Sequence, residues 1–288
     1  MSPTIIVAVD ASPEALAASR HGALLSSLLQ AQLLLLHVQP PAAADLSDVP
    51  ANRTPDTDAD RLTRQRNAEQ VIASAREVAE GVGAEAIDSR IVADPSLSGD
   101  TAAQVIEVSR SYPDSHVVIG SRRLNEMARI LYDSISQNVV HGIPGPITVV
   151  YNDPEPPPRI DRILLPIDGS RHSDDAADLA GAMARAGRIP VELLHVLPAA
   201  GAGDGSPEPD AALAQARQRL GDTGARIEEH TLHADKPGVA ILHYAPAKPD
   251  GTVIVMGRRG LSHLREHLVG SVSHHVLTHA HCPVTVVT

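Results

Sequence analysis

The chain has 288 residues, a net charge of −11, 43% hydrophobic residues and a single cysteine, Cys282. An acidic chain without a large basic face is a poor candidate for nucleic-acid binding. No apolar run is long enough to span a membrane, and Met1–Val9 lacks the features of a signal peptide. One cysteine excludes an internal disulfide framework, so we expect a cytoplasmic protein with no membrane association.

The first half of the chain alternates between predicted strands and predicted helices. Apolar runs predict strands over Thr4–Val9, Gln32–Val38, Ala86–Val92, His116–Gly120 and Pro146–Tyr151. Helices are predicted from Ser12, over Arg61–Glu80, around Thr101–Ser111 and around Ser134–His141. The strands are continuously apolar, which indicates burial on both faces and a mostly parallel sheet. The predicted fold class is α/β, doubly wound and Rossmann-like.

The second half of the chain repeats the first. Four stretches recur in the same order: Ile5–Asp10 as Ile163–Asp168, Leu35–Val38 as Leu193–Val196, Val117–Leu124 as Ile254–Leu261, and Pro146–Val150 as Pro283–Val287. The first half also carries a longer middle segment, around Pro40–Asp60. The repeat is too long for a solenoid, so we predict two domains, 1–152 and 159–288. The proline-rich segment Asn152–Pro158 is predicted to be a stiff, extended linker.

A glycine-containing loop follows the predicted strand Thr252–Met256. It contains Gly257 and Gly260 and ends at Gly270–Val272, where a helix is predicted to begin near Ser273. Glycines let the backbone approach an anion, and the first N–H groups of a helix point towards it. The spacing differs from the dinucleotide fingerprint, and the loop lacks the Walker lysine. The pattern therefore predicts a phosphate-binding loop of another kind, at the carboxyl end of a parallel strand.

Together these motifs resemble the universal stress protein family in its tandem form. The resemblance lies in a strand ending in Val-Asp, a second ending in His-Val, the loop Gly-x2-Gly-x9-Gly-Ser, and a closing Cys-Pro-Val-Thr-Val-Val. It implies a five-stranded parallel sheet in each domain, domains paired through their last strands, and ATP bound in many members. It also implies a regulatory role in the stress response and a homodimer of chains.

The resemblance places a nucleotide site in the second domain. Asp168 resembles the acid beside the ribose and the metal, so we expect ATP with Mg²⁺, and Val196 resembles the residue whose backbone reads adenine. Of the adjacent Arg258 and Arg259, we expect one to contact the phosphates. The predicted site is Asp168, Val196, Met256, Gly257, Arg259, Gly260, Gly270, Ser271 and Val272. Because the chain has no Phe and no Trp, the base must lie between aliphatic walls.

The first domain departs from this pattern at two positions. Arg123 stands where the second domain has Gly260, and Asp133 stands where it has Gly270. A carboxylate close to a phosphate costs about 3 kcal/mol at an intermediate dielectric. We therefore expect a degenerate site in which Arg123 pairs with Asp133; in the alternative, Arg123 grips the phosphate. The degenerate site would comprise Asp10, Val38, Gly120, Arg123, Asp133 and Ser134.

Three functions remain open at this point. The first is a regulatory module that holds ATP in its second domain and acts on a protein partner. The second is a slow Mg²⁺-dependent ATPase or an autophosphorylating protein, although no catalytic residue is recognisable and Lys236 and Lys248 both lie outside the glycine loop. The third is an interaction protein that binds no nucleotide.

Histidines raise the question of a metal site. His263 with His267, and His275 with His279, have the i, i+4 spacing that can share a metal. No cysteine or acid completes either ligand set, so we expect surface histidines and no metal site. His37 and His195 recur at equivalent positions, which the duplication explains without a catalytic role.

Overall fold

The computed structural model describes residues 3–39, 57–93, 100–122, 134–152, 156–199, 209–245, 250–258 and 269–288. The described residues form two compact units, the first ending at Ile143 and the second beginning at Pro144. Several residues of the predicted sites lie outside the described ranges: Arg123, Asp133, Arg259, Gly260, His263 and His267.

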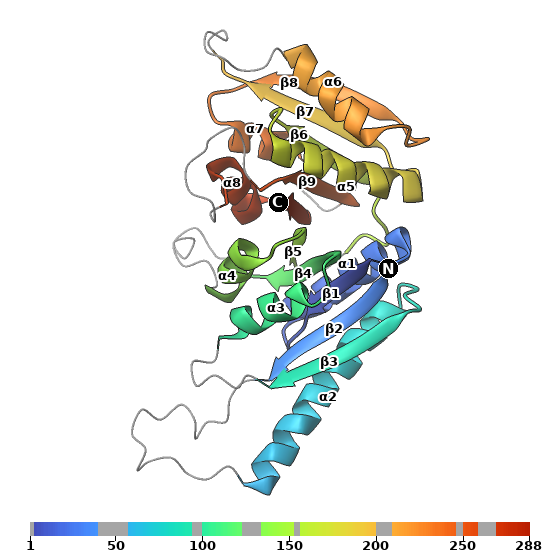
Figure 1. Ribbon diagram of the computed structural model, residues 1–288, viewed down its shortest axis with the longest axis vertical. Helices are drawn as coiled ribbons and strands as arrows, with labels where there is room; N and C mark the ends of the chain where they lie inside the picture. Colours follow the sequence, from blue (N-terminus) through green and yellow to red (C-terminus); the bar gives the residue numbers. More distant parts are fainter. Residues whose placement is uncertain are drawn as a thin grey trace. The chain divides into compact units, whose positions relative to one another are not determined.

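The first unit is a parallel sheet between helices. Its elements are β1 (Thr4–Ala8), α1 (Pro13–Leu29), β2 (Gln32–Gln39), α2 (Asp58–Glu80), β3 (Ile87–Ala93), α3 (Thr101–Arg110), β4 (Ser115–Ser121) and α4 (Ser134–Gly142). The strand order is β3-β2-β1-β4, and every pair is parallel. Helices α1 and α2 pack together on one face of the sheet, and α3 and α4 pack together on the other (Figure 1).

The second unit repeats this plan with two added strands, β10 and β5. Its elements are β5 (Ile147–Tyr151), β6 (Arg162–Ile167), α5 (Arg171–Gly187), β7 (Val191–Leu197), α6 (Pro209–Leu220), β8 (Ile227–His233), α7 (Pro237–Tyr244), β9 (Thr252–Gly257), α8 (Ser271–His279) and β10 (Val284–Val287). The strand order is β5-β10-β9-β6-β7-β8. All pairs are parallel except β5 with β10, which is antiparallel.

The last strand of the first repeat therefore belongs to the second unit. Val149 lies opposite Val284, and the buried hydroxyls of Thr148 and Thr285 are 2.7 Å apart. This pairing covers the edge of β10, which would otherwise expose unpaired backbone groups. Pairing between the last strands of the two repeats was expected from the sequence, and the structure contains it.

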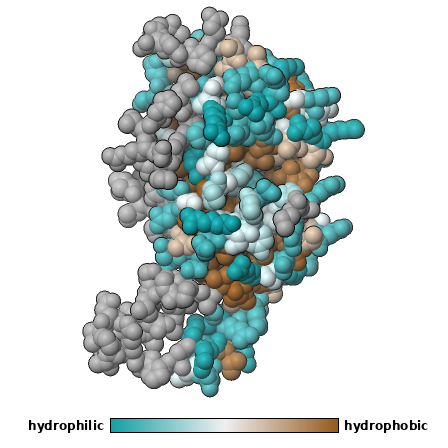
Figure 2. Space-filling model, viewed as in Figure 1, coloured by the Kyte–Doolittle hydropathy of each residue, from teal (hydrophilic) through white to brown (hydrophobic). Residues whose placement is uncertain are grey.

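The α/β fold class is confirmed, and the predicted elements differ from the observed ones by only a few residues at their ends. α1 begins as expected, because the Ser12 hydroxyl accepts a hydrogen bond from the backbone N–H of Ala15. α2 begins earlier than predicted, because Thr57 and Asp60 form a capping box that the periodicity did not reveal. Most strand residues are buried, whereas two large apolar side chains, Leu62 on α2 and Ile91 on β3, are exposed. Apolar patches lie among polar ones on the face seen in Figure 2.

Candidate functional site

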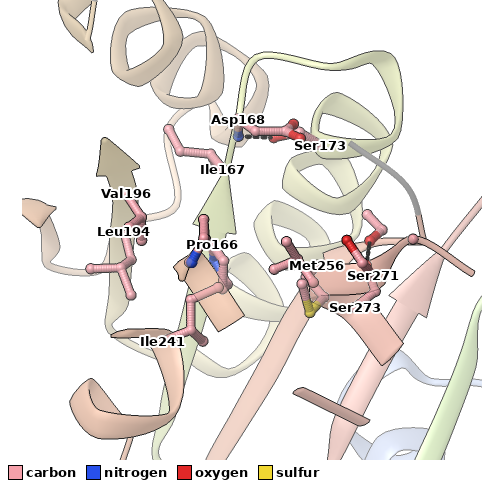
Figure 3. A pocket seen from close by; sticks show the side chains of 14 residues that line it. Pro166, Ile167, Asp168, Ser173, Leu194, Val196, Ile241, Met256, Ser271 and Ser273 are labelled. Carbon is pink, nitrogen blue, oxygen red and sulfur yellow. Dashed lines mark hydrogen bonds between the residues drawn. The ribbon is translucent and has the colours of Figure 1, made fainter. Parts of the chain in front are cut away.

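A pocket of about 280 Å³ opens at the carboxyl ends of β6, β7 and β9. The connections leave β6 and β9 in opposite directions along the sheet, so this is the topological switch point at which doubly wound sheets bind ligands. The apolar part of the wall, shown in Figure 3, consists of Pro166, Ile167, Leu194, Val196, Ile241 and Met256. This wall is aliphatic except for one thioether, so a flat ring would be held between alkyl groups.

Most of the predicted nucleotide site meets in this pocket. The residues that line it include Asp168, Val196, Met256, Gly257, Gly270, Ser271 and Val272. Strands β6, β7 and β9 bring the first four together, and the start of α8 supplies the last three. Only Arg259 and Gly260 of the predicted set lie outside the described residues.

The N-terminus of α8 forms the polar side of the pocket. Gly270 is the N-cap and supplies no side-chain cap, so the amides of Ser271, Val272 and Ser273 have no hydrogen-bond acceptor among the described residues. The Ser273 hydroxyl donates instead to the carbonyl of Gly257 at 2.8 Å. Three unpaired amides at the positive end of a helix form an anion site.

Gly270 lines the pocket and also closes the loop that precedes α8. Its own amide donates to the carbonyl of Arg258 at 2.8 Å, which joins the two ends of the loop and removes this amide from the set available to an anion. Its φ is −65°, which any residue adopts, so glycine is not needed here for the backbone conformation. Its contribution is the missing side chain, which leaves the start of α8 without a side-chain cap.

Gly257 is required for packing as well as for the pocket. A Cβ at this position would lie 2.8 Å from the carbonyl carbon of His172, in the first turn of α5. The same close approach occurs in the first unit, where a Cβ on Gly120 would lie 2.4 Å from the carbonyl of Glu14 in α1. The sequence suggested only close approach to a ligand, and the helix packed against each glycine was missed.

Arg258 points away from the pocket. Its side chain is 5% exposed, and its guanidinium donates to the carbonyl of Gly145 at 3.3 Å. Of the two adjacent arginines, Arg258 therefore supports the turn before β5, and Arg259 stays the candidate for a phosphate contact.

Asp168 lies at the rim of the pocket beside α5. Its Oδ1 accepts a hydrogen bond from the backbone N–H of Ser170 at 3.0 Å, and Oδ2 has no donor among the described residues. Gly169 between them has a φ of +74°, a conformation that favours glycine. One oxygen is thus fixed and the other is available to a hydroxyl group or to a cation. Mg²⁺ is commonly held by one or two carboxylates together with phosphate oxygens, so the residues present fit this ion.

A second helix end lies beside the same pocket. Pro237, the first residue of α7, lines the wall, and the N-cap of this helix is Lys236, which makes no side-chain cap. Lys236 lines a neighbouring surface groove and not this pocket, so its charge acts on the pocket from outside. Lys236 lies outside the glycine loop in sequence, and only the Lys-Pro pair at a helix start signals its place beside the pocket.

His195 is buried next to Asp168. Burial lowers the pKa of His195, and the nearby Asp168 partly opposes this shift, so the ring is neutral near pH 7. Its Nδ1 has no hydrogen-bond partner among the described residues, whereas Nδ1 of the equivalent His37 lies 2.8 Å from the carbonyl oxygen of Val9.

The first unit has a pocket at the equivalent place. It measures about 330 Å³ and is lined by Asp10, Val38 and Gly120 among others. Ser134 begins α4, but its side chain lies outside the described set, as do Arg123 and Asp133. The predicted pairing of Arg123 with Asp133 therefore stays a prediction.

No group of three metal-ligating side chains occurs in the part of the chain that the structure describes. The rings of His275 and His279 stack with their centroids 4.2 Å apart, and Nδ1 of His279 lies 2.9 Å from the backbone carbonyl of His275. No described helix combines the length and the apolarity needed to cross a membrane.

Comparison with known proteins identifies the family. The model of the universal stress protein family matches residues 1–151 and 159–288. Universal stress proteins of Mycolicibacterium smegmatis and Mycobacterium tuberculosis are each 28% identical to this chain over 98% of its length and 96% of theirs. A universal stress protein structure from Archaeoglobus fulgidus shares the fold, with a TM-score of 0.70 and 22% identity over 99% of this chain and 96% of that one. The chain therefore belongs to the universal stress protein family and carries two tandem copies of its domain.

Proposed function

We propose that the second unit binds ATP, with the phosphates at the N-terminus of α8 and the base against the apolar wall. The observation that carries this proposal is the set of three amides, on Ser271, Val272 and Ser273, that have no acceptor among the described residues and belong to residues lining a mostly apolar pocket. Backbone amides at a helix end bind phosphate without a lysine. The uncapped start of α7 strengthens the positive field at the same pocket.

The remaining parts of the ligand follow from the geometry around these amides. The base would lie between the side chains from β6, β7 and α7, with hydrogen bonds from the backbone near Val196. The carboxylate of Asp168 would accept bonds from ribose hydroxyls and supply one ligand to Mg²⁺. Membership of the universal stress protein family supports adenine as the base.

The pocket is better suited to holding a nucleotide than to turning it over. Asp168 is the only titratable residue among the described residues that line it. Phosphoryl transfer needs an aligned base or nucleophile in addition to a phosphate cradle. We therefore propose a regulatory role in the cytoplasm, in which bound ATP controls contact with a protein partner during stress. Because β5 already pairs with β10, a homodimer would use another surface.

Calorimetric titration with Mg-ATP tests the proposal. The wild-type chain should bind one ATP tightly, and Gly270→Asp should weaken binding at least about a hundredfold, because a new carboxylate caps the amides and repels the phosphates. Gly270→Asn is the matched control, since it can cap the helix without adding charge, and it should lose less affinity. Unchanged affinity in Gly270→Asp would refute the site. Substantial ATP hydrolysis that disappears in Asp168→Ala would favour an enzyme instead.

A further inference from the structure

The edge strand β8 of the second unit presents backbone groups that have no partner strand. The carbonyl of Arg226 and the N–H of Ala234, at the two ends of this strand, both bond to β7. Backbone groups alternate in direction along a strand, so those of Glu229, Thr231 and His233 point away from β7. These outward N–H and C=O groups make no hydrogen bond within the part of the chain that the structure describes. Such an edge is a template for the addition of another strand.

The corresponding edge of the first unit, β3, satisfies several of its outward groups from within. The N–H of Ile87 donates to the carbonyl of Glu85 at 3.2 Å, and the carbonyl of Ile87 accepts a bond from the guanidinium of Arg76 at 3.2 Å. The N–H of Ser89 donates to the carboxylate of Asp88 at 2.7 Å. Side chains that occupy an edge in this way hinder the addition of a strand. Of the two edges, β8 is therefore the more open to a partner.

The side chains of β8 are complementary to themselves when the strand pairs antiparallel with its own copy. With Thr231 opposite Thr231 of the second copy, Glu229 lies opposite His233 on the same face of the sheet. A carboxylate accepts a hydrogen bond from an imidazole N–H, and two threonine hydroxyls can bond to each other. The chain already contains such a pair where β5 and β10 run antiparallel, because the hydroxyls of Thr148 and Thr285 lie 2.7 Å apart there.

The surface beside β8 has room for a second copy. The flanking helices α6 and α7 pack over β7, and an open groove lies next to β8 on the side of α7. Leu232, Val239, Ala240 and Tyr244 are among the residues that line this groove. In the same register Leu232 lies opposite His230 of the second copy, and within one chain the ring of His230 lies against Tyr244 with the centroids 5.2 Å apart. The second copy would therefore cover apolar surface as well as the backbone edge.

We infer that a second copy of the chain adds to β8, which joins the sheets of two second units into one antiparallel sheet. Thr231 lies at the two-fold axis, so the same surface is used on both copies and the assembly closes as a homodimer. The outward backbone of β8 supplies the hydrogen bonds, and the pairing of Glu229 with His233 sets the register. This inference goes beyond the proposed function and is independent of it, because these three residues do not line the nucleotide pocket.

Sedimentation of the full chain over a series of concentrations tests the inference. The wild-type chain should form a dimer that dissociates on dilution. Thr231→Pro should leave only monomer at concentrations where the wild type is dimeric, because it removes an outward N–H and none of the bonds to β7. Ile91→Pro is the matched control and should leave the dimer intact, since Ile91 occupies the same position on β3. Urea unfolding checks that both variants are folded.

A charge exchange tests the register. His233→Glu places two carboxylates opposite each other on both sides of the axis and should weaken the dimer about tenfold. Adding Glu229→Lys to this variant should restore the dimer. Because Glu229 also pairs with Arg217 at 2.7 Å in its own chain, urea unfolding must show that the double variant is folded.

Three results would overturn the inference. The first is a wild-type chain that is monomeric at every concentration, and the second is a dimer that survives Thr231→Pro. The third is a dimer that is weakened by His233→Glu and not recovered in the folded double variant. None of these measurements uses ATP, so a failure of the proposed function leaves them unaffected.

Discussion

The two pockets share one strand framework and differ at the helix ends beside it. In the second unit, α8 begins with three amides that find no acceptor in the described part of the chain, and α7 begins at Lys236 without a side-chain cap. In the first unit, α3 is capped by the carboxylate of Asp100. The two pockets therefore share their strand-end walls but present different helix ends to any ligand, and the uncapped ends of the second unit favour an anion more than the capped end of α3 does.

A second difference between the units lies in their cores. The first unit buries His21 on α1 and His116 on β4, which are 7% and 4% exposed, where the second unit has Leu179 and Val253. The equivalence follows from the register, because His116 lies beside Ile5 of β1 just as Val253 lies beside Ile163 of β6.

The largest expected effect is a loss of stability in acid that is greater in the first unit than in the second. Burial lowers the pKa of His21 from 6.5 to about 4. Burial, and to a lesser extent the nearby His21, lowers the pKa of His116 to about 3. Both rings are neutral in the folded chain but bind protons in the unfolded chain below pH 6.5. Stability is therefore lost as the pH falls from 6.5 towards 4 and then 3, by a few kcal/mol.

Urea unfolding at several pH values measures this loss. The double variant His21→Leu, His116→Val copies the second unit and should remove most of the acid sensitivity of the first unit. Carboxylates also protonate in this range, so the comparison is between variant and wild type at each pH. Equal losses in both proteins would show that the two histidines do not determine the difference between the units.

The next largest effect is a loss of stability when a methyl group is added at the glycine where a helix packs closely against a strand in each unit. Gly120→Ala places a Cβ 2.4 Å from backbone atoms of Glu14, and Gly257→Ala places one 2.8 Å from backbone atoms of His172. We expect losses in the free energy of unfolding of about 3 and about 2 kcal/mol respectively, because backbone atoms must move in both cases. Urea unfolding of the two variants tests this order, and a larger loss for Gly257→Ala would contradict it.

The sequence predicted the strands and the position of the pocket better than the residues at the helix ends. Continuous apolar runs located the strands, and the glycine pattern after Met256 located the pocket, because both signals are local. The roles of Asp100 and Lys236 were not predicted, because knowing which helices begin at the pocket requires the strand order. The direction of Arg258 depends on the carbonyl of Gly145, a contact distant in sequence. The start of α2 depends on a capping box within a polar stretch, where hydrophobic periodicity gives no signal.

The smallest effect tests most directly whether helix ends set the charge of the ligand. Lys236→Gln removes a cation from the start of α7, and we expect the affinity of the second pocket for ATP to fall about two- to fivefold. Asp100→Asn keeps a side-chain cap on α3 but removes its charge, so any binding of ATP to the first pocket should tighten by a similar factor. Both charges are exposed, and salt screens exposed charges over about 10 Å at 0.1 M. The two shifts should therefore fade together in calorimetric titrations at rising salt, whereas the effect of Gly270→Asp on the amides themselves should persist. If neither variant changes the affinity of its pocket for ATP at low salt, the caps do not distinguish the pockets, and the difference must come from residues after β4 and β9.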